Sequence, residues 1–290
     1  MNRKKLGSFC IDNIVWVLLV VSIIAMGIIK PVFFTPKILA NIFTQTTVLG
    51  IFTVAMAMAI LLGDINLSII GTAAFSAAIA TSLMCYQGLH WILAAILCMV
   101  IGFLVGLLNG FIIAKIKAVA LIETLAMNMV LSGAVLAITQ GKTTSNYPDA
   151  YKFIGQGSVA GLPVLPIVLF IVYILFYIVW KKTVYGRSLF AVGGNPNSAY
   201  AAGINVDRIK MTSFAVGGLL SGLAGYLLSS YMGAVTTSFG DAYEMQSIAA
   251  AVIGGVSLSG GRGCQTANYN RVQQQIKIPS DTYQTARSCL

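Results

Sequence analysis

The chain has 290 residues, of which 58% are apolar and only 9% are charged, whereas soluble domains are roughly 45–50% apolar and about 25% charged. Its 18 basic and 8 acidic residues are too few to cover the surface of a soluble protein of this size. The composition therefore excludes a soluble enzyme, a disulfide-rich scaffold and a disordered protein. It indicates a membrane protein.

Eight apolar runs are candidates for membrane spans, because a bilayer core of roughly 30 Å needs about 20 mostly apolar residues in a helix. Backbone groups in lipid need internal hydrogen-bond partners, so we read these runs as helices. The chain is therefore predicted to be an all-α, polytopic membrane bundle with about eight transmembrane helices. In chain order the runs cover residues 14–29, 40–62, 67–86, 90–114, 118–139, 162–180, 211–232 and 243–258.

The basic residues between the runs predict the orientation. If the N-terminus is cytoplasmic, eleven basic residues lie inside: Arg3, Lys4, Lys5, Lys115, Lys117, Lys181, Lys182, Arg187, Arg208, Lys210 and Arg262. Four lie outside: Lys30, Lys37, Lys142 and Lys152. The positive-inside rule favours this orientation. We expect an uncleaved first helix and a multi-pass protein of the bacterial plasma (inner) membrane.

Other composition signals point to no metal or nucleic-acid site. The five cysteines lie far apart without metal-ligand spacing and are expected to pack as small apolar residues. His90, beside Trp91, is expected at a membrane interface. The net charge of +10 is dispersed over short loops, so it predicts topology and no nucleic-acid patch.

Two features predict how the helices pack. The run 211–232 carries a face of small residues on which another helix can approach closely: Gly217, Gly218, Ser221, Gly222, Ala224 and Gly225. The segments 59–68 and 250–259 match in Ala, Gly, Leu and Ser at a constant offset of 191 residues. Inverted repeats with interrupted helices are typical of transporters, although small-residue matches also arise by chance.

Polar residues inside the apolar runs are candidates for a translocation pathway. Glu123 lies in the run 118–139 with Asn128 five residues later, and an ionisable group at membrane depth should face protein or water. Lys115 and Lys117 are close in sequence, so snorkelling or ion pairing of Glu123 is an equal alternative. Asp64 and Asn66 lie at a glycine-flanked break. We interpret them as structural caps of two abutting helices in preference to substrate ligands.

The inside loop from Thr183 to Lys210 carries the most specific local pattern. A Gly-Gly-Asn-Pro start signal precedes a short Ala-rich helix from about Asn197 to Ala202, and Gly203 ends it. Such a helix is a docking element for a cytoplasmic partner, or an ordinary amphipathic connector. The string Gly141-Lys142-Thr143-Thr144 resembles a phosphate-binding loop, but Leu136 stands where the first glycine is needed, so no ATPase is predicted on this chain.

Three strings resemble the permease subunits of bacterial ATP-binding-cassette importers for ribose and related monosaccharides. They are GDINLSIIG (63–71), YGRSLFAVGGNPNSAYAAGINVDRIK (185–210) and YEMQSIAAAVIGGVSLSGGRG (243–263). The resemblance implies no cofactor on this chain, with ATP and Mg²⁺ on a separate ATPase, and no enzymatic activity of its own. It also implies a second permease subunit, homo- or heterodimeric, an external sugar-binding protein and contact with lipid.

The resemblance also implies roles for particular residues. A coupling helix around 195–203 would enter a groove on the ATPase, and the residues implied in coupling are Gly193, Gly194, Asn195, Ala199, Ala202, Gly203 and Arg208. The candidates for the translocation pathway are Asp64, Asn66, Ser68, Glu123, Asn128 and Glu244. The sequence departs from the family where Asn66 replaces the usual Asp, where Ala120-Leu121 replaces Pro-Phe, and at Glu123.

The composition changes abruptly after Gly263. The last 27 residues contain five Gln and scattered apolar residues, so they cannot form a membrane span. We therefore divide the chain into a transmembrane permease domain, 1–263, and a polar, irregular tail, 264–290. Both the repeat and the resemblance predict two further helices, which suggests a truncation or frame shift.

The sequence leaves two alternatives to a sugar importer. One is an inactive permease remnant or a membrane scaffold that does not transport. The other is a secondary transporter driven by ions, with Glu123 as the proton site.

Overall fold

The computed structural model describes residues 14–143, 145, 147–159, 162–236 and 239–262. Its helices are α2 (Ile14–Ile29), α3 (Pro36–Ile60), α4 (Ile69–Gln87), α5 (Trp91–Phe111), α6 (Ala120–Thr139), α7 (Asp149–Gln156), α8 (Val164–Lys182), α9 (Val184–Gly194), α10 (Pro196–Ala201), α11 (Val206–Met232) and α12 (Tyr243–Ile253). The short elements are the 3₁₀-helix η1 (Pro31–Phe34), the π-helix η2 (Ile112–Ile116), and two antiparallel two-residue strands, β1 (Ser158–Val159) and β2 (Leu162–Pro163).

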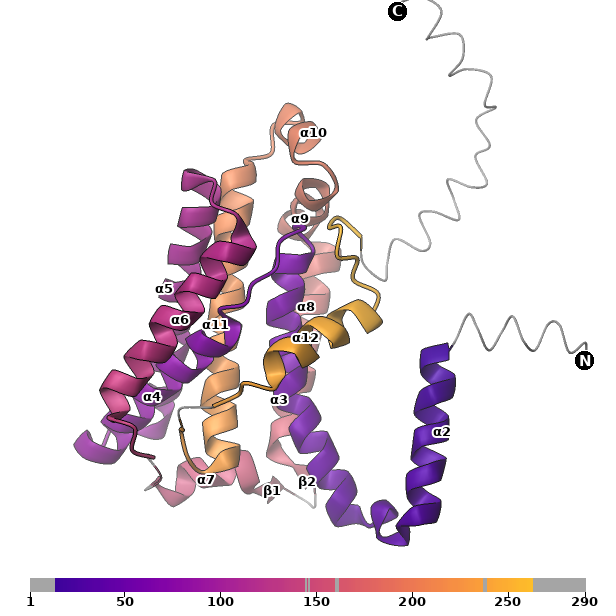
Figure 1. The fold of residues 1–290 in the computed structure, drawn as a ribbon, viewed down its shortest axis with the longest axis vertical. Coiled ribbons are helices and arrows are strands. Elements are labelled where there is room, and N and C mark those ends of the chain that lie inside the picture. The colour runs from indigo at the N-terminus through magenta and orange to yellow at the C-terminus, as the bar shows by residue number, and fades with distance from the viewer. Residues whose placement is uncertain (1–13, 144, 146, 160–161, 237–238, 263–290) are drawn as a thin grey trace, which may run out of the picture.

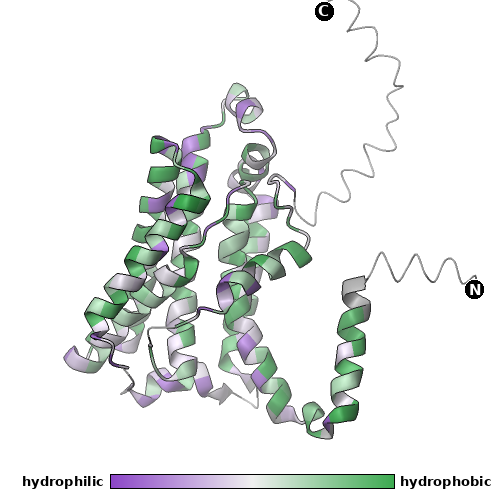
Figure 2. Ribbon diagram, viewed as in Figure 1, coloured by the Kyte–Doolittle hydropathy of each residue, from purple (hydrophilic) through white to green (hydrophobic). Residues whose placement is uncertain are grey.

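Among the described residues, six helical segments are long and apolar enough to cross a membrane, so the chain is a polytopic helical membrane protein. They are Ile38–Ile60, Ile69–Gln87, Trp91–Ile116, Ala120–Thr139, Val164–Lys182 and Val206–Met232. The predicted count of eight spans is not confirmed, because α2 has 16 residues and α12 has 11. At about 1.5 Å per residue, α12 covers roughly half of a bilayer core. Figure 2 shows hydrophobic residues along the bundle and α2, with hydrophilic residues gathered at α7 and α10.

The helices alternate between two ends of the bundle (Figure 1). We call one end the α10 end. It carries η2, α9, α10 and the turns after α3 and α12. The other, the α7 end, carries η1, the α4–α5 turn, α7 and both strands. This arrangement groups the loops as the charge pattern predicted, and the described basic residues at the α7 end are restricted to Lys30, Lys37, Lys142 and Lys152.

Helix α11 is the centre of the bundle and packs on α5, α3 and α4. A Cβ added to Gly218 or Gly222 would overlap the backbone of α5, and one added to Gly225 would overlap Ala73 of α4. On α5, Gly102 and Gly106 make the matching close approach to α11. The predicted small-residue face is therefore confirmed. Cys98, fully buried in this core, packs as predicted for a small apolar residue.

Helix α7 is held against the end of α11 by hydrogen bonds. The buried Tyr151 hydroxyl donates to the Tyr226 carbonyl at 2.7 Å, and the Ser230 hydroxyl donates to the Tyr151 carbonyl at 2.6 Å. Burial holds the pKa of the Tyr151 phenol well above its usual value, so this group stays a donor. These contacts fix the loop between α6 and α8 across the α7 end.

The interrupted region after α3 leads back into the bundle. In Figure 1 the segment 61–68 runs from the α10 end to mid-height, where α4 begins, and α12 also begins at mid-height. Helix termini within the membrane expose backbone groups that need polar partners. The break therefore requires a buried polar environment.

The two repeat copies end their helices in the same way. Gly63 and Gly255 both adopt positive φ, +82° and +92°, and the following amides close equivalent turns, Asp64 N to Ala59 O and Val256 N to Ala251 O, each 3.1 Å. These caps are 192 residues apart, one more than the offset of 191 predicted from the sequence. The later turns, Ser68 N to Asn66 Oδ1 and Ser259 N to Ser257 Oγ, return to 191. The first copy therefore has one extra residue between its cap and its turn.

Candidate functional site

The short helix α10 forms because its start and stop signals are strong. The Asn195 side chain accepts hydrogen bonds from the amides of Asn197 (3.0 Å) and Ser198 (3.1 Å), with Pro196 in the first turn. Gly203 ends the turn with φ +82°. The predicted helix is confirmed, shifted by one residue to Pro196–Ala201.

Helix α10 projects from the α10 end of the bundle (Figure 1). Within it only Ala199 is buried, whereas Tyr200 is 76% exposed. The coupling candidates Gly194, Asn195, Ala202, Gly203 and Arg208 are also exposed. A rigid, exposed helix on a capped loop presents a defined surface for another protein.

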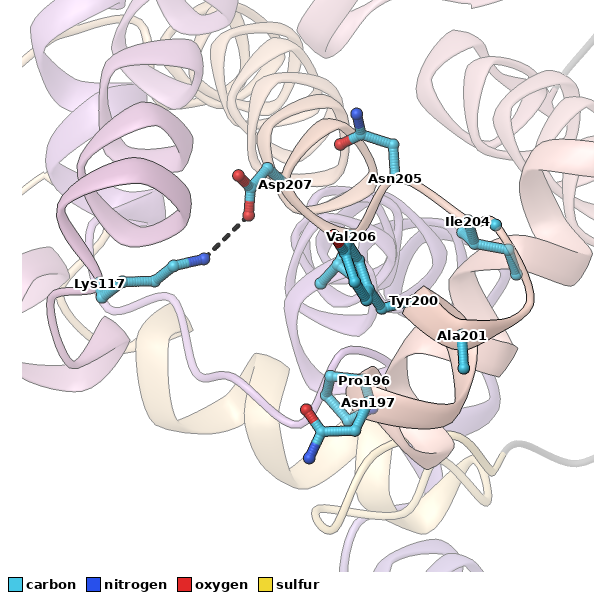
Figure 3. Close-up of a pocket in the computed structure, with 10 residues that line it drawn as sticks. Lys117, Pro196, Asn197, Tyr200, Ala201, Ile204, Asn205, Val206 and Asp207 are labelled. Atoms are coloured by element: carbon cyan, nitrogen blue, oxygen red, sulfur yellow. Dashed lines mark hydrogen bonds and ion pairs between the residues drawn. The ribbon is translucent and has the colours of Figure 1, made fainter.

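A cavity of about 800 Å³ lies beside this helix. Figure 3 shows Lys117 opposite the α10 residues Pro196, Asn197 and Tyr200, with its ammonium directed to Asp207. The Asp207 carboxylate pairs with Lys117 Nζ at 2.9 Å and with Lys115 Nζ at 3.0 Å. Because both lysines are mostly exposed, these pairs orient the loop more than they stabilise it.

Three segments that are distant in sequence meet through glycines near the base of this loop. They are 61–63, 193–194 and 260–261, which we call the glycine junction. The Gly261 amide donates to the Leu61 carbonyl at 2.9 Å. A Cβ at Gly193 would overlap the Leu61 carbonyl, and one at Gly260 would lie 2.7 Å from Gly63 N. The junction places the end of α9, just before α10, in backbone contact with the first repeat copy and with the two glycines that follow the second copy.

An ion pair makes a second connection between the break and α11. Asp64 Oδ2 and Lys210 Nζ are 2.8 Å apart, and their side chains are only 17% and 21% exposed. The interpretation of Asp64 as a helix cap is wrong, because its carboxylate binds Lys210 and not a helix N-terminus. Asp64 thus joins the break to the first turns of α11, which follow α10 directly.

The break itself is held by a buried polar cluster. Asn66 Oδ1 accepts from the Ser68 amide at 3.0 Å and from the Ser68 hydroxyl at 2.7 Å, forming the turn that precedes α4. The side-chain amide of Asn109 on α5 is hydrogen-bonded to Ser68 Oγ at 2.7 Å, and Thr124 Oγ1 of α6 accepts from the Leu67 amide at 3.1 Å. The structural role predicted for Asn66 agrees with this geometry.

Glu123 lies at the edge of this cluster. With the Asn109 amide in its alternative orientation, the nitrogen donates to Glu123 Oε1 at 3.2 Å, while Glu123 Oε2 is buried without a hydrogen bond to any described residue. Of the two alternatives left open for Glu123, ion pairing with Lys115 or Lys117 is wrong, because both lysines bind Asp207. Glu123 therefore faces the protein interior.

Asn128 and Glu244 lie in a different place. Both line a small cavity of about 30 Å³ between α4, α6 and the start of α12, together with Asp241 and Ser132. The pathway candidates thus separate into two groups, one at the break and one beside this cavity. Among the described residues no group of His, Cys, Asp and Glu is arranged to hold a metal ion.

The comparison with protein families identifies the chain. Residues 38–262 match the family described as the permease component of the branched-chain amino acid transport system. The chain belongs to this permease family. This match includes the break, the α9–α10 loop and both repeat copies.

Several curated relatives of this permease have a sugar in their names. It is 37% identical over 266 residues to the ribose import permease protein of Haemophilus influenzae, covering 90% of the chain and 82% of the relative. It is 36% identical over 262 residues to the ribose import permease protein of Bacillus subtilis, covering 90% and 79%. The fructose import permease protein of Rhizobium meliloti is 31% identical over 256 residues, 85% of the chain and 71% of the relative. No solved structure gives a significant match.

Sequence reasoning found α10 and the break but missed what joins them. The Asp64–Lys210 pair spans 146 residues, and nothing in the sequence pairs one acidic residue with one of many lysines. The glycine junction had a partial signal, since the repeat alignment matched Gly63 to Gly254 near Gly260. The alignment could not indicate that Gly193 lies between the two copies.

Proposed function

We propose that this chain is the membrane permease subunit of an ATP-binding-cassette importer for a ribose-like monosaccharide. Sugar permeases at 31–37% identity over most of the chain support this proposal. In it the chain has no catalytic residue and needs no cofactor of its own. ATP and Mg²⁺ bind a cytoplasmic ATPase, an external binding protein delivers the sugar, and a second permease subunit completes the membrane unit.

The α10 end is placed in the cytoplasm in this proposal. Most described basic residues lie at that end, as the positive-inside rule requires. Helix α10 is then the coupling helix that docks on the ATPase. The observation that carries the proposal is the pair of connections from this loop to the break, through the glycine junction and Asp64–Lys210.

These connections give a physical route from ATP to the membrane. Closure of the ATPase dimer moves α10, and tightly packed backbones transmit movement because they cannot be compressed. The break carries Asn66 and Ser68, whose hydrogen bonds hold the start of α4. Movement of the loop therefore changes the polar cluster. ATP can drive this change only if the two conformations bind nucleotide with different affinity.

The pathway is suited to a neutral substrate in this account. Asn66, Ser68, Asn109 and Thr124 are uncharged amides and hydroxyls, which are buried and hydrogen-bonded within the cluster here and can bind sugar hydroxyls when the cluster rearranges. The test is whether the chain co-purifies with its cognate ATPase and supports ATP-dependent uptake of a pentose. Failure of both, in an assay where the Bacillus subtilis relative succeeds, would contradict the proposal.

A further inference from the structure

Two cavities at the α7 end share one residue, Tyr231 at the end of α11. The first, of about 390 Å³, lies among the start of α3, the end of α7 and β1–β2, and includes Asn41, Thr44 and Gln156. The second, of about 330 Å³, lies towards α12 and includes Gln45, Asp241 and Tyr243. Tyr231 therefore forms a wall between two spaces in the size range of small-molecule sites.

Tyr231 is held in place from both sides. Gln156 Nε2 donates to its backbone carbonyl at 3.0 Å, and Gln45 Nε2 donates to its hydroxyl at 3.4 Å. Its side chain is only half-buried, so ring surface remains open to the cavities. Tyr243 packs its ring against Phe52 with centroids 5.6 Å apart, which fixes a second aromatic wall.

The lining has the chemistry of a site for a neutral, hydroxyl-rich ligand. Tyrosine rings offer apolar faces, and the amides of Asn41, Gln45 and Gln156 both donate and accept hydrogen bonds. No lysine or arginine of the described segments lines either cavity. An anionic ligand such as a phosphate or carboxylate would find no counter-ion there.

The second cavity lies next to residues of the predicted pathway. Asp241 lines both the second cavity and the small one that contains Asn128 and Glu244. That inner space, about 30 Å³, admits water but not a sugar. Asp241 is therefore the residue shared by the second cavity and the space that holds the pathway candidates Asn128 and Glu244.

We propose that the surface around Tyr231 is an outer sugar site, at which a neutral monosaccharide binds to the permease before it reaches the pathway. In the second cavity Tyr231 and Tyr243 contact the apolar face of the sugar ring, while Gln45 and Asp241 bind its hydroxyls. The inference rests on the proposed function for the identity of the sugar and for the external position of the α7 end. It assigns a ligand site to residues of which Tyr243 alone belongs to one of the sequence motifs.

The test measures binding without transport. The five natural cysteines are replaced, and Met232, which is half exposed and lines the second cavity, becomes the single cysteine. The rate of cysteine alkylation by a membrane-impermeant maleimide is measured on the full chain in vesicles. We expect ribose to slow labelling of Met232→Cys, whereas an equal osmolality of betaine leaves it unchanged. The control Tyr86→Cys, 80% exposed at the same end, should label at one rate throughout.

Two variants at Tyr231 test its role in this assay. Tyr231→Ala should raise the ribose concentration that gives half protection about fivefold, because the ring contact is lost. Tyr231→Phe keeps the ring and should change it about twofold or less. Ribose protection in Tyr231→Phe also verifies that a variant at this position keeps the site folded.

Each outcome decides the inference. Labelling that ribose does not slow, protection that is equal at Tyr86→Cys, or protection by betaine and not by ribose would overturn it. Protection without ATP-dependent uptake would support the outer sugar site while contradicting the importer. Uptake without protection would contradict the site and leave the importer standing.

Discussion

The Asp64 carboxylate and the Lys210 ammonium lie 2.8 Å apart and join the membrane break to the helix that follows α10. Both side chains are mostly buried, so loss of one leaves the other charge poorly solvated. The pair joins the break to α11 through side chains, whereas the glycine junction joins it to the end of α9 through backbones. Substitutions of this pair therefore give the simplest test of whether a transport defect arises from folding or from energy coupling.

Asp64→Ala and Lys210→Ala should each uncouple the permease. We expect ATP hydrolysis by the assembled complex to continue while sugar transported per ATP falls about tenfold, with a loss of about 1–3 kcal/mol in stability. The exchanged pair Asp64→Lys/Lys210→Asp should recover much of the coupling. Equal stability losses without any change in the ratio of sugar to ATP would reduce the pair to a structural role.

The glycine junction offers a matched pair of substitutions. Gly193→Ala places a Cβ on the Leu61 carbonyl, whereas a Cβ at Gly194 has no atom within 4 Å. We expect Gly193→Ala to lower stability by about 1–3 kcal/mol through overpacking, with a fall in uptake, and Gly194→Ala to be close to neutral. Thermal unfolding in detergent measures both. Similar unfolding temperatures for the two variants would mean that the junction is not tightly packed.

Docking of α10 is tested with two exposed tyrosines. Tyr200 on α10 and Tyr86 at the α7 end are 76% and 80% exposed, so neither substitution leaves a cavity. Tyr200→Glu should lower co-purification of the ATPase about tenfold or more, because a charge enters the contact. Tyr86→Glu should leave it unchanged. Retention of the ATPase by Tyr200→Glu would place the docking surface elsewhere.

Glu123 separates ATP-driven from ion-driven transport. Its Oε1 lies within reach of the Asn109 amide, a contact that Glu123→Gln can reproduce. We expect uptake by Glu123→Gln to stay within about threefold of the parent chain and to remain insensitive to proton uncouplers. Abolished uptake in the variant, together with uncoupler sensitivity in the parent chain, would support the proton-site alternative.

The sequence was sufficient wherever local rules determine the structure. Asn195, Pro196 and Gly203 form a complete set of start and stop signals, and α10 follows them within one residue. The small residues of α11 were predicted as a contact face because small side chains are the means by which helices approach closely in membranes. The break after α3 was visible because glycines and an acidic residue interrupt an apolar run.

Other features depend on tertiary arrangement. The run 243–258 looked long enough for a span, but Gly254 and Gly255 end α12 after 11 residues. The lysines near Glu123 in sequence bind Asp207, which lies 84 residues away from Glu123 along the chain. Tyr231 carried no signal at all, since a tyrosine at the end of an apolar helix is ordinary. Its neighbours in space come from α3, α7 and α12.

The most direct test of the account is uptake of radiolabelled ribose by proteoliposomes that contain this chain, its cognate ATPase and the external binding protein. We expect accumulation to require ATP on the side of the ATPase. Unlabelled ribose or a related pentose should compete with the labelled sugar, and proton uncouplers should have no effect. Accumulation without ATP would contradict the account. So would its absence when the Bacillus subtilis ribose permease, assembled in the same way, accumulates the sugar.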